Sequence, residues 1–191
     1  MFTISVRRRG FTLIELVLFI VIVSAAVAGV LVAYDYAARD SADPVVRRQA
    51  LSIAESMLEE IQQMPFTYCD PNDANVSTAT GPFVGPTGCA ATVEALGPEL
   101  GETRYSPNNP FNNVNDYNGY STAGEVPPGI KDIIGVPIVG LSAYNVAVTV
   151  APSAIGGVPA SESLQITVTV TGPAHVTVTV DGYRTRYAPN L

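Results

Sequence analysis

Residues 7–16 read RRRGFTLIEL, three arginines followed by the start of a long apolar run. The run extends over residues 11–34, and Glu15 is its only ionisable side chain before the closing Tyr34. A helix of this length spans about 36 Å, which is enough to cross a bilayer. Arginines on one flank hold that end in the cytoplasm. We therefore predict a transmembrane helix over residues 11–34, with everything after Asp35 on the far side of the membrane.

Glu15 separates three explanations of this helix. A cleaved secretory signal has an apolar core of about 7 to 15 residues, which is shorter than the run observed. A plain anchor leaves Glu15 unexplained unless the side chain snorkels to the cytoplasmic face, because a carboxylate in a spanning helix costs roughly 2.5 to 3.5 kcal/mol. The third explanation is a helix that is inserted in the membrane at first and later leaves it. That explanation requires a cation at the depth of Glu15.

The stretch RGFTLIEL, residues 9–16, resembles the prepilin signal of the type IV pilin and pseudopilin superfamily. The resemblance implies that a prepilin peptidase removes a leader of residues 1–10 by cutting after Gly10, and then methylates the new amine of Phe11. It also implies an assembly role for Glu15, whose carboxylate would neutralise the amine of a neighbouring subunit. Two buried charges of opposite sign, each costly alone, would favour a single register of assembly.

Residues 35–64 are predicted to continue as an amphipathic helix. From Pro44 to Met64 the apolar side chains recur at intervals of three and four residues, and polar side chains fill the other face. Asp43 as N-cap and Pro44 at the first helical position would start a separate helix. We expect instead one long helix that bends at Pro44 and ends at Pro65.

Alternation of apolar and polar residues marks the last third of the chain. It predicts three strands, over residues 144–150, 164–170 and 176–180, each with one buried face. Residues 171–175 are short enough to join the second and third strands as an antiparallel hairpin. The large side chains change parity after Asp181-Gly182, so we expect a bulge or a turn there. An amphipathic helix and a one-faced sheet complete each other's core, which predicts an α+β fold of the pilin type.

Residues 65–142 form the predicted loop region of a β-rich head, residues 65–191. They contain 10 prolines and 10 glycines, and no helical or strand period persists, although short helical turns or an edge strand are expected within them. Both cysteines, Cys69 and Cys89, lie in this region. Beyond the bacterial membrane the compartment oxidises thiols, so we expect a disulfide that stabilises the head by roughly 3 kcal/mol.

Three groups of polar residues suggest sites. The oxygens of residues 70–75 suit Ca²⁺, but Asn75 stands where an EF-hand requires glycine, so a solvated loop is expected. Residues 115–117 with Tyr120 suggest a contact surface, although Asn and Asp also favour turns. Arg184 and Arg186 are expected to pair with acidic neighbours, to stack on the rings of Tyr183 and Tyr187, or to guard an edge strand.

Composition excludes several functions. A net charge of -7 with a single lysine offers little cationic surface, so nucleic acid is not an expected partner. The one histidine, His175, has no evident nucleophile or carboxylate partner, and no glycine-rich phosphate loop occurs. We therefore predict neither enzymatic activity nor a cofactor or metal.

Residues 41–44, 49–55, 58–61 and 182–187 further resemble the minor pilins of the mannose-sensitive haemagglutinin (MSHA) pilus. This resemblance implies a low-abundance subunit of the bacterial inner membrane, with its head in the periplasm, that helps to start or cap a filament. Its implied partners are other pilin subunits, the prepilin peptidase, and the pilus assembly platform with its ATPase. Three alternatives remain open: a type II secretion pseudopilin, a surface adhesin head, and an uncleaved membrane-anchored protein.

Overall fold

The computed structural model describes residue 10 and residues 12–186, without the side chains of residues 36–43. The chain divides into two compact units, Met1–Pro44 and Val45–Leu191. Helix α1 (Leu13–Gln63) contributes to both units and contains Pro44 within it. The alternative of a separate helix starting at Pro44 is therefore wrong. Helix α1 continues through Pro44 although proline has no N–H group to donate a helical hydrogen bond. The proposed N-cap side chain of Asp43 lies outside the described side chains.

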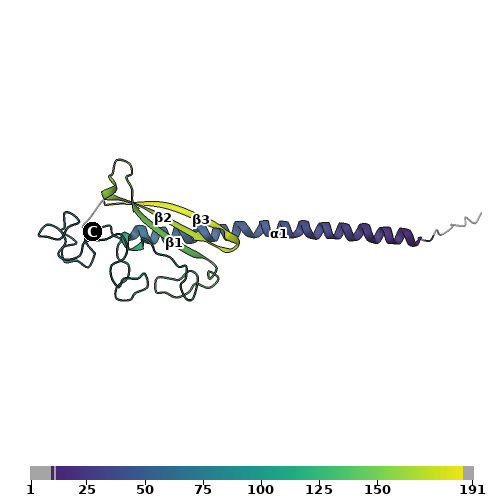
Figure 1. Cartoon of the computed structure of the whole chain (residues 1–191), viewed down its shortest axis with the longest axis horizontal. Coiled ribbons are helices and arrows are strands. Elements are labelled where there is room, and N and C mark those ends of the chain that lie inside the picture. The colour runs from purple at the N-terminus through teal and green to yellow at the C-terminus, as the bar shows by residue number, and fades with distance from the viewer. Residues whose placement is uncertain (1–9, 11, 187–191) are drawn as a thin grey trace, which may run out of the picture. The chain divides into compact units, whose positions relative to one another are not determined.

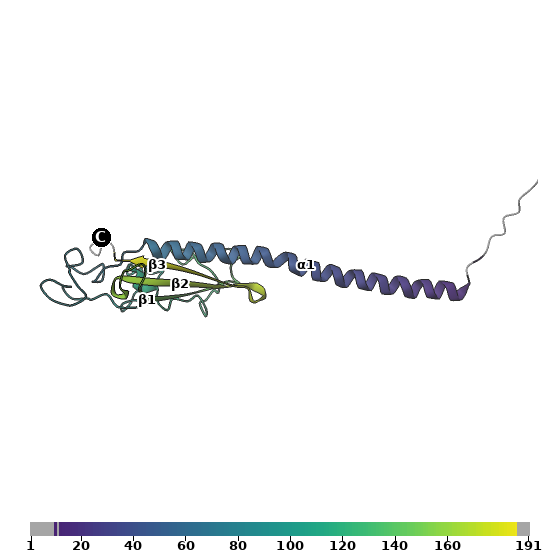
Figure 2. The same ribbon diagram turned by 90° about the horizontal axis from the view of Figure 1, so that it is seen from above.

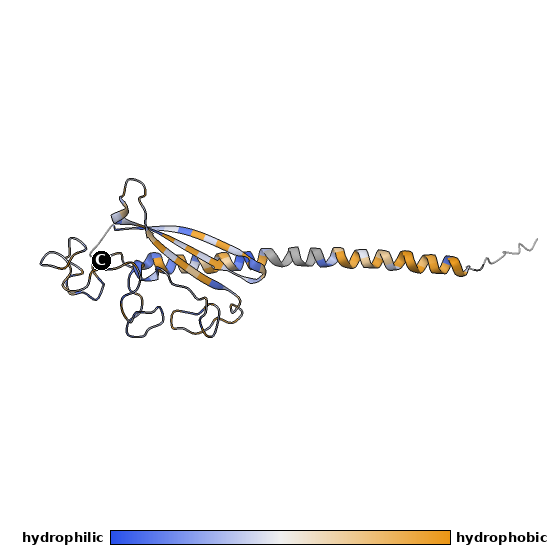
Figure 3. Ribbon diagram, in the orientation of Figure 1, coloured by the Kyte–Doolittle hydropathy of each residue, from blue (hydrophilic) through white to orange (hydrophobic). Residues whose placement is uncertain are grey.

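The first unit consists, in its described residues, of an apolar helix. Leu13–Asp35 is long and apolar enough to span a membrane, by length and composition. In Figure 3 the ribbon of this segment is coloured as hydrophobic along most of its length.

The second unit contains a three-stranded antiparallel meander in the order β1 (Asn145–Pro152), β2 (Ser163–Thr171), β3 (Thr177–Thr185). Val146 pairs with Val170 and Val168 pairs with Val180, so the valines fall on one face of the sheet. Figures 1 and 2 show the strands running along the C-terminal half of α1. The expected α+β fold, a long N-terminal helix with an antiparallel sheet, is confirmed.

A short turn joins β2 to β3, as the sequence predicted. Its centre is the 3-10 helix η3 (Pro173–His175), where Ala174 and His175 adopt φ values of 55° and 61°. The only histidine of the chain is exposed there.

The expected bulge or turn at Asp181-Gly182 is wrong. Asp181 pairs with Thr167 and Gly182 with Ile166, so the ladder of β3 continues unbroken to Thr185. A Cβ atom at Gly182 would lie 2.7 Å from Leu58 Cδ1 of α1. The glycine therefore marks the close approach of helix and strand rather than a break in the strand.

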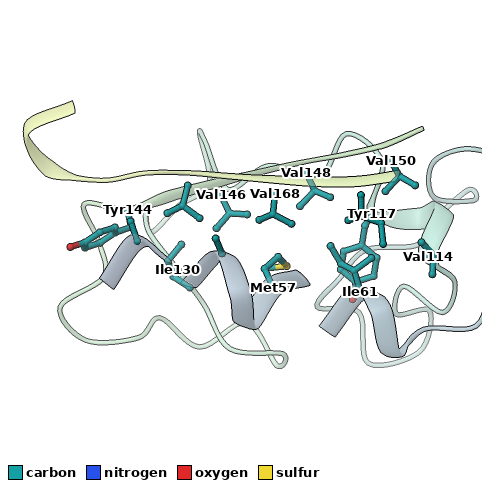
Figure 4. Close-up of a cluster of buried hydrophobic side chains, with 14 of the residues drawn as sticks. Met57, Ile61, Val114, Tyr117, Ile130, Tyr144, Val146, Val148, Val150 and Val168 are labelled. Atoms are coloured by element: carbon teal, nitrogen blue, oxygen red, sulfur yellow. The ribbon is translucent and has the colours of Figure 1, made fainter. Parts of the chain in front are cut away.

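The core lies between α1 and the sheet. Ala50, Ala54, Met57 and Ile61 follow one another at helical spacing and are all buried. They face the inward valines of β1 and β2, and Figure 4 shows Met57 and Ile61 pointing toward Val148 and Val168. Burying a valine, isoleucine or methionine side chain stabilises the fold by about 1.5 to 3 kcal/mol. The apolar stripe of α1 and the apolar face of the sheet therefore occur together.

The loop region 65–142 carries little regular structure but is well packed. It contains the 3-10 helix η1 (Val114–Tyr117), and a second, η2 (Ala160–Glu162), lies between β1 and β2. Residues 119–122 run beside the outer edge of β1, where the Thr122 N–H donates to the Val146 carbonyl and the Val148 N–H donates to the Tyr120 carbonyl. The region thus contains a short helical turn, as expected. In place of the expected edge strand it has only a short segment beside β1.

Candidate functional site

The start of α1 holds the residues of the expected processing site. Gly10 is exposed and non-helical, and α1 begins three residues later at Leu13. Thr12 caps the helix, because the Glu15 N–H donates to Thr12 Oγ1 at 3.3 Å and to the Thr12 carbonyl at 3.1 Å. The cap leaves Gly10 in backbone that is not locked into helical hydrogen bonds. Phe11 and residues 1–9 lie outside the described residues.

Glu15 lies in the first turn of α1 with an exposed side chain. A carboxylate at this position is favoured by the partial positive charge of the helix N-terminus, by about 0.3 to 1 kcal/mol. This gain is smaller than the cost of a carboxylate in lipid, roughly 2.5 to 3.5 kcal/mol. The macrodipole alone therefore does not account for Glu15 in a helix of this composition.

The surface around Glu15 is apolar and has no protein cover within the described chain. None of the residues in the apolar window of Leu13–Asp35 is buried. The large side chains nearest its start are 53 to 80% exposed: Leu13, Ile14 and Leu16. An exposed apolar surface of this extent needs lipid or other helices to cover it. It is consistent with membrane anchoring by a single span.

In the second unit, a buried ion pair ties α1 to the loop region. Arg104 Nε and Nη2 donate to the two carboxylate oxygens of Glu60 at 2.7 and 2.6 Å, and the hydroxyl of Tyr117 donates to Glu60 Oε1 at 2.8 Å. Burial alone would lower the pKa of Arg104, but its hydrogen bonds and charge contact with Glu60 outweigh burial and raise it. Burial and the same carboxylate raise the pKa of Tyr117.

Cys69 and Cys89 form a disulfide with Cα atoms 5.4 Å apart. Asp73 organises the loop that they close, because its carboxylate accepts the backbone N–H groups of four residues at 2.8 Å each: Asn75, Ala90, Ala91 and Thr92. The hydrogen bond from Thr92 and the other three hold the pKa of Asp73 well below its usual range. The Asp73 carboxylate, one of the groups considered for an EF-hand, is thus engaged in the loop's own backbone. Asp70 and Asp73 are buried, so the expectation of a solvated loop is wrong for these two side chains.

Arg186 both pairs and stacks, two of the roles weighed for it. Its Nε lies 3.1 Å from Glu162 Oε2, and its guanidinium lies 3.7 Å from the ring centroid of Phe66 and 4.2 Å from that of Tyr68. Burial lowers the pKa of Arg186. The rings are not those of the neighbouring tyrosines, and Tyr187 lies outside the described residues.

The contact surface suggested at residues 115–117 is wrong. Asp116 and Tyr117 are fully buried in η1, and Tyr117 belongs to the main core. Tyr120 is half-buried and its hydroxyl lies 2.6 Å from that of Tyr105. Asp116 Oδ2 accepts the backbone N–H groups of Asn112 and Asn113, and the Tyr117 hydroxyl donates to Glu60. Such bonds are expected where a loop packed on a core must satisfy its buried backbone groups.

Five carboxylates that sequence reasoning did not single out as a group gather in the loop region: Asp70, Glu94, Glu99, Glu102 and Asp116. Burial, and then the like charges of its neighbours, raises the pKa of Glu94 to about 9. The same two causes raise the pKa of Glu102 to about 7. Burial raises that of Asp116 to about 6, against the hydrogen bonds it accepts. The composition of residues 65–142, with eight acidic and two basic side chains, is a sequence signal for such an acidic group.

Comparison with known proteins identifies the N-terminus only. No curated protein and no solved structure matches the chain. Residues 6–31 match the family model of the prokaryotic N-terminal methylation motif, a segment that includes Gly10, Glu15 and most of the exposed apolar helix. The chain therefore carries the N-terminal signature of type IV pilins and pseudopilins, and this signature supports its place in that superfamily.

Proposed function

We propose that this chain is a minor type IV pilin of the MSHA type, a structural subunit that helps to start or cap a filament. In this proposal it enters the inner membrane with its amino terminus in the cytoplasm and its head in the periplasm. Prepilin peptidase cuts after Gly10 and methylates Phe11, and the assembly platform with its ATPase then moves the subunit into a filament. Pilins are structural subunits, so we propose no enzymatic activity.

The observation that carries this proposal is the methylation motif over an apolar helix that bears one carboxylate. Cleavage after Gly10 would create an ammonium group four residues before Glu15. An ion pair at about 4 Å is worth about 4 kcal/mol at an effective dielectric constant of 20, enough to offset the burial of Glu15 in a bundle of like helices. A mismatched register would leave both charges unpaired. Charge pairing would therefore select one register of assembly.

The MSHA assignment rests on resemblance outside the motif. The segments 49–55, 58–61 and 182–187 resemble MSHA biogenesis protein D, whereas residues 65–142 resemble it poorly. The first two segments lie on the part of α1 that packs against the sheet, and the third begins at the close approach of Gly182 to α1. This distribution favours a shared helix-and-sheet scaffold with a different loop region.

Mass spectrometry of the amino terminus of the purified native protein tests the processing step. We expect a chain that begins at Phe11 and carries one methyl group. Gly10→Val should retain the leader, whereas Thr12→Ser, which keeps the capping hydroxyl, should be processed normally. A native chain that begins at Met1 would contradict the proposal and leave an uncleaved anchored protein.

A type II secretion pseudopilin would carry the same motif and is the second candidate. Deletion of the gene from its native host separates the two. Loss of surface pili with normal protein secretion supports the minor pilin. Loss of secretion with normal piliation supports the pseudopilin.

A further inference from the structure

The five carboxylates are brought together by the packing of three separate loop segments. The bridge between Cys69 and Val93 places Asp70 and Glu94 on adjacent stretches of chain. Glu99 and Glu102 lie on one turn, closed by the Glu102 N–H donating to the Glu99 carbonyl at 3.1 Å. Asp116 comes from η1. The result is two groups that share Glu99, one with Glu94 and Asp116 and one with Asp70 and Glu102, and in each group one oxygen per residue lies within 4.8 Å of the others.

Asp116 is held so that one oxygen remains available. Its side chain is fully buried, and its Oδ2 accepts the backbone N–H groups of Asn112 and Asn113 at 2.7 Å each. Its Oδ1 has no hydrogen-bond partner among residues 12–186. A buried oxygen without a partner costs free energy, and more so when it carries charge. This fixed carboxylate therefore points to a missing ligand.

Glu94 and Glu99 also have buried carboxylate oxygens without a hydrogen-bond partner. Both carboxylate oxygens of Glu94 and the Oε2 of Glu99 are buried and lack a hydrogen-bond partner in the described part of the chain. Glu99 Oε1, by contrast, accepts the Ala95 N–H at 3.2 Å, which orients the side chain. Three carboxylates thus converge with at least one unused oxygen each.

The cations nearby are committed elsewhere. Arg104 is paired with Glu60, Lys131 with Glu125 at 2.7 Å, and Arg186 with Glu162. Arg186 also interacts electrostatically with Glu94, but its Nε lies 3.1 Å from Glu162 Oε2. Burial first, and then the like charges of Asp116, Glu99, Asp70 and Glu102, raise the pKa of Glu94 to about 9. A bound cation would remove this repulsion, because a divalent ion favours the charged form of every carboxylate around it.

We propose that Glu94, Glu99 and Asp116 form a calcium-binding site in the head, with Asp70 and Glu102 as additional acidic groups beside it. Ca²⁺ takes six to eight oxygens at about 2.3 to 2.6 Å, so oxygens on opposite sides of one ion lie about 4.6 to 5.2 Å apart. Oxygens within 4.8 Å of one another fit that sphere. An all-carboxylate set excludes a soft-metal preference, and Mg²⁺ prefers to keep most of its water.

Two surface pockets border the site. Glu102 and Asp116 line a pocket of about 660 Å³, and Glu94 lines another of about 340 Å³. The unpartnered oxygens of Glu94, Glu99 and Asp116 are themselves buried, so the loops must shift for an ion to enter from either pocket. The three proposed ligands lie outside residues 70–75, the loop considered for an EF-hand. Asp70 belongs to that loop, and its Oδ1 accepts the Asn72 N–H.

Terbium and calcium titrations of the full-length protein in detergent test the proposal. Tyrosine-sensitised luminescence of TbCl₃ should appear on binding and be displaced by CaCl₂, since Tyr117 is adjacent to Asp116 and the chain has no tryptophan. The midpoint of thermal unfolding, followed by circular dichroism, should rise by several degrees in CaCl₂ relative to EGTA. MgCl₂ at the same concentration should give a smaller rise.

Glu99→Gln is the decisive variant, because Glu99 is shared by both groups and glutamine can still accept the Ala95 N–H. We expect at least a tenfold loss of Ca²⁺ affinity, with stability in EGTA equal to or above that of the wild type because a like charge is removed. Glu59→Gln, which removes the same charge from an exposed position on α1, should bind as the wild type does. If Glu99→Gln fails to fold, Glu94→Gln replaces it with the same expectations.

Two results would overturn the site. The first is a wild-type protein that shows no terbium luminescence and no calcium-dependent shift, which would mean that protons alone balance these carboxylates. The second is an equal loss of affinity in Glu59→Gln and Glu99→Gln, which would mean diffuse binding to an acidic surface.

Discussion

The ion pair between Glu60 and Arg104 should be a main determinant of head stability. The side chains of Arg104 and Glu60 are only 5% and 22% exposed, and two short hydrogen bonds join them. Glu60→Gln keeps the size of the side chain but leaves the guanidinium buried without its counter-charge. Removing one partner of a buried pair costs about 3 to 5 kcal/mol. The Tyr117 hydroxyl also loses a charged acceptor. We therefore expect Glu60→Gln to lower the free energy of unfolding by an amount within this range and not below it.

Urea unfolding of the full-length protein in detergent, followed by circular dichroism, measures this loss. With a slope of about 1 to 3 kcal/mol per molar urea, the midpoint should fall by more than about 1 M. Glu59→Gln is the matched control, because it is the neighbouring exposed residue and should change stability by no more than about 0.5 kcal/mol. The double variant Glu60→Met with Arg104→Met should lose less than the sum of the two single variants.

A loss below about 1 kcal/mol for Glu60→Gln, or one equal to that of Glu59→Gln, would refute this reasoning. It would mean that water reaches the pair and screens it as it screens a surface salt bridge. Additive single variants would likewise show that the two side chains do not act as a unit.

Three further predictions concern other parts of the chain. Glu15→Ala should leave cleavage after Gly10 intact but reduce incorporation into filaments, as measured by immunoblotting of sheared pili; normal incorporation would exclude charge pairing. Gly182→Val should destabilise the head by about 1 to 3 kcal/mol in urea, because its side chain would overlap Leu58, and a neutral result would exclude close packing there. Asp73→Asn should destabilise the head most at neutral pH. The folded pKa of Asp73 lies below its unfolded value of about 3.9, so its contribution is complete above that value and is lost as the pH falls through the folded pKa. Thermal unfolding at several pH values checks this, and a deficit that grows on acidification would contradict it.

The periodic elements could be predicted because their signals are local. Alternation over residues 144–150 and 164–170 follows from a sheet with one buried face, and the helical spacing of Ala50 to Ile61 follows from packing on that face. The same local logic failed at Gly182. A glycine in a strand suggests a bulge, and only the position of Leu58 on α1 shows that it is needed for a close approach.

The loop region could not be predicted in the same way, because its structure depends on contacts between distant residues. Asp73 binds backbone groups up to 19 positions away, and Arg104 reaches Glu60 across 44 positions. The carboxylates of Glu94 and Asp116 belong to no contiguous motif, so a search for a calcium loop within residues 70–75 missed them. The processing residues Gly10 and Phe11, by contrast, were found from a short motif alone, and their cleavage and methylation remain predictions.

The loop closed by Cys69 and Cys89 bears on how the head would mature after the export that we propose. The chain has only two cysteines, so no incorrect pairing is possible within one molecule. The carboxylate of Asp73 accepts the N–H groups of Asn75 and of residues 90–92, which follow Cys89, through bonds that need no oxidant. An oxidase alone should therefore complete this head, and a strain without a disulfide isomerase should still produce it in full.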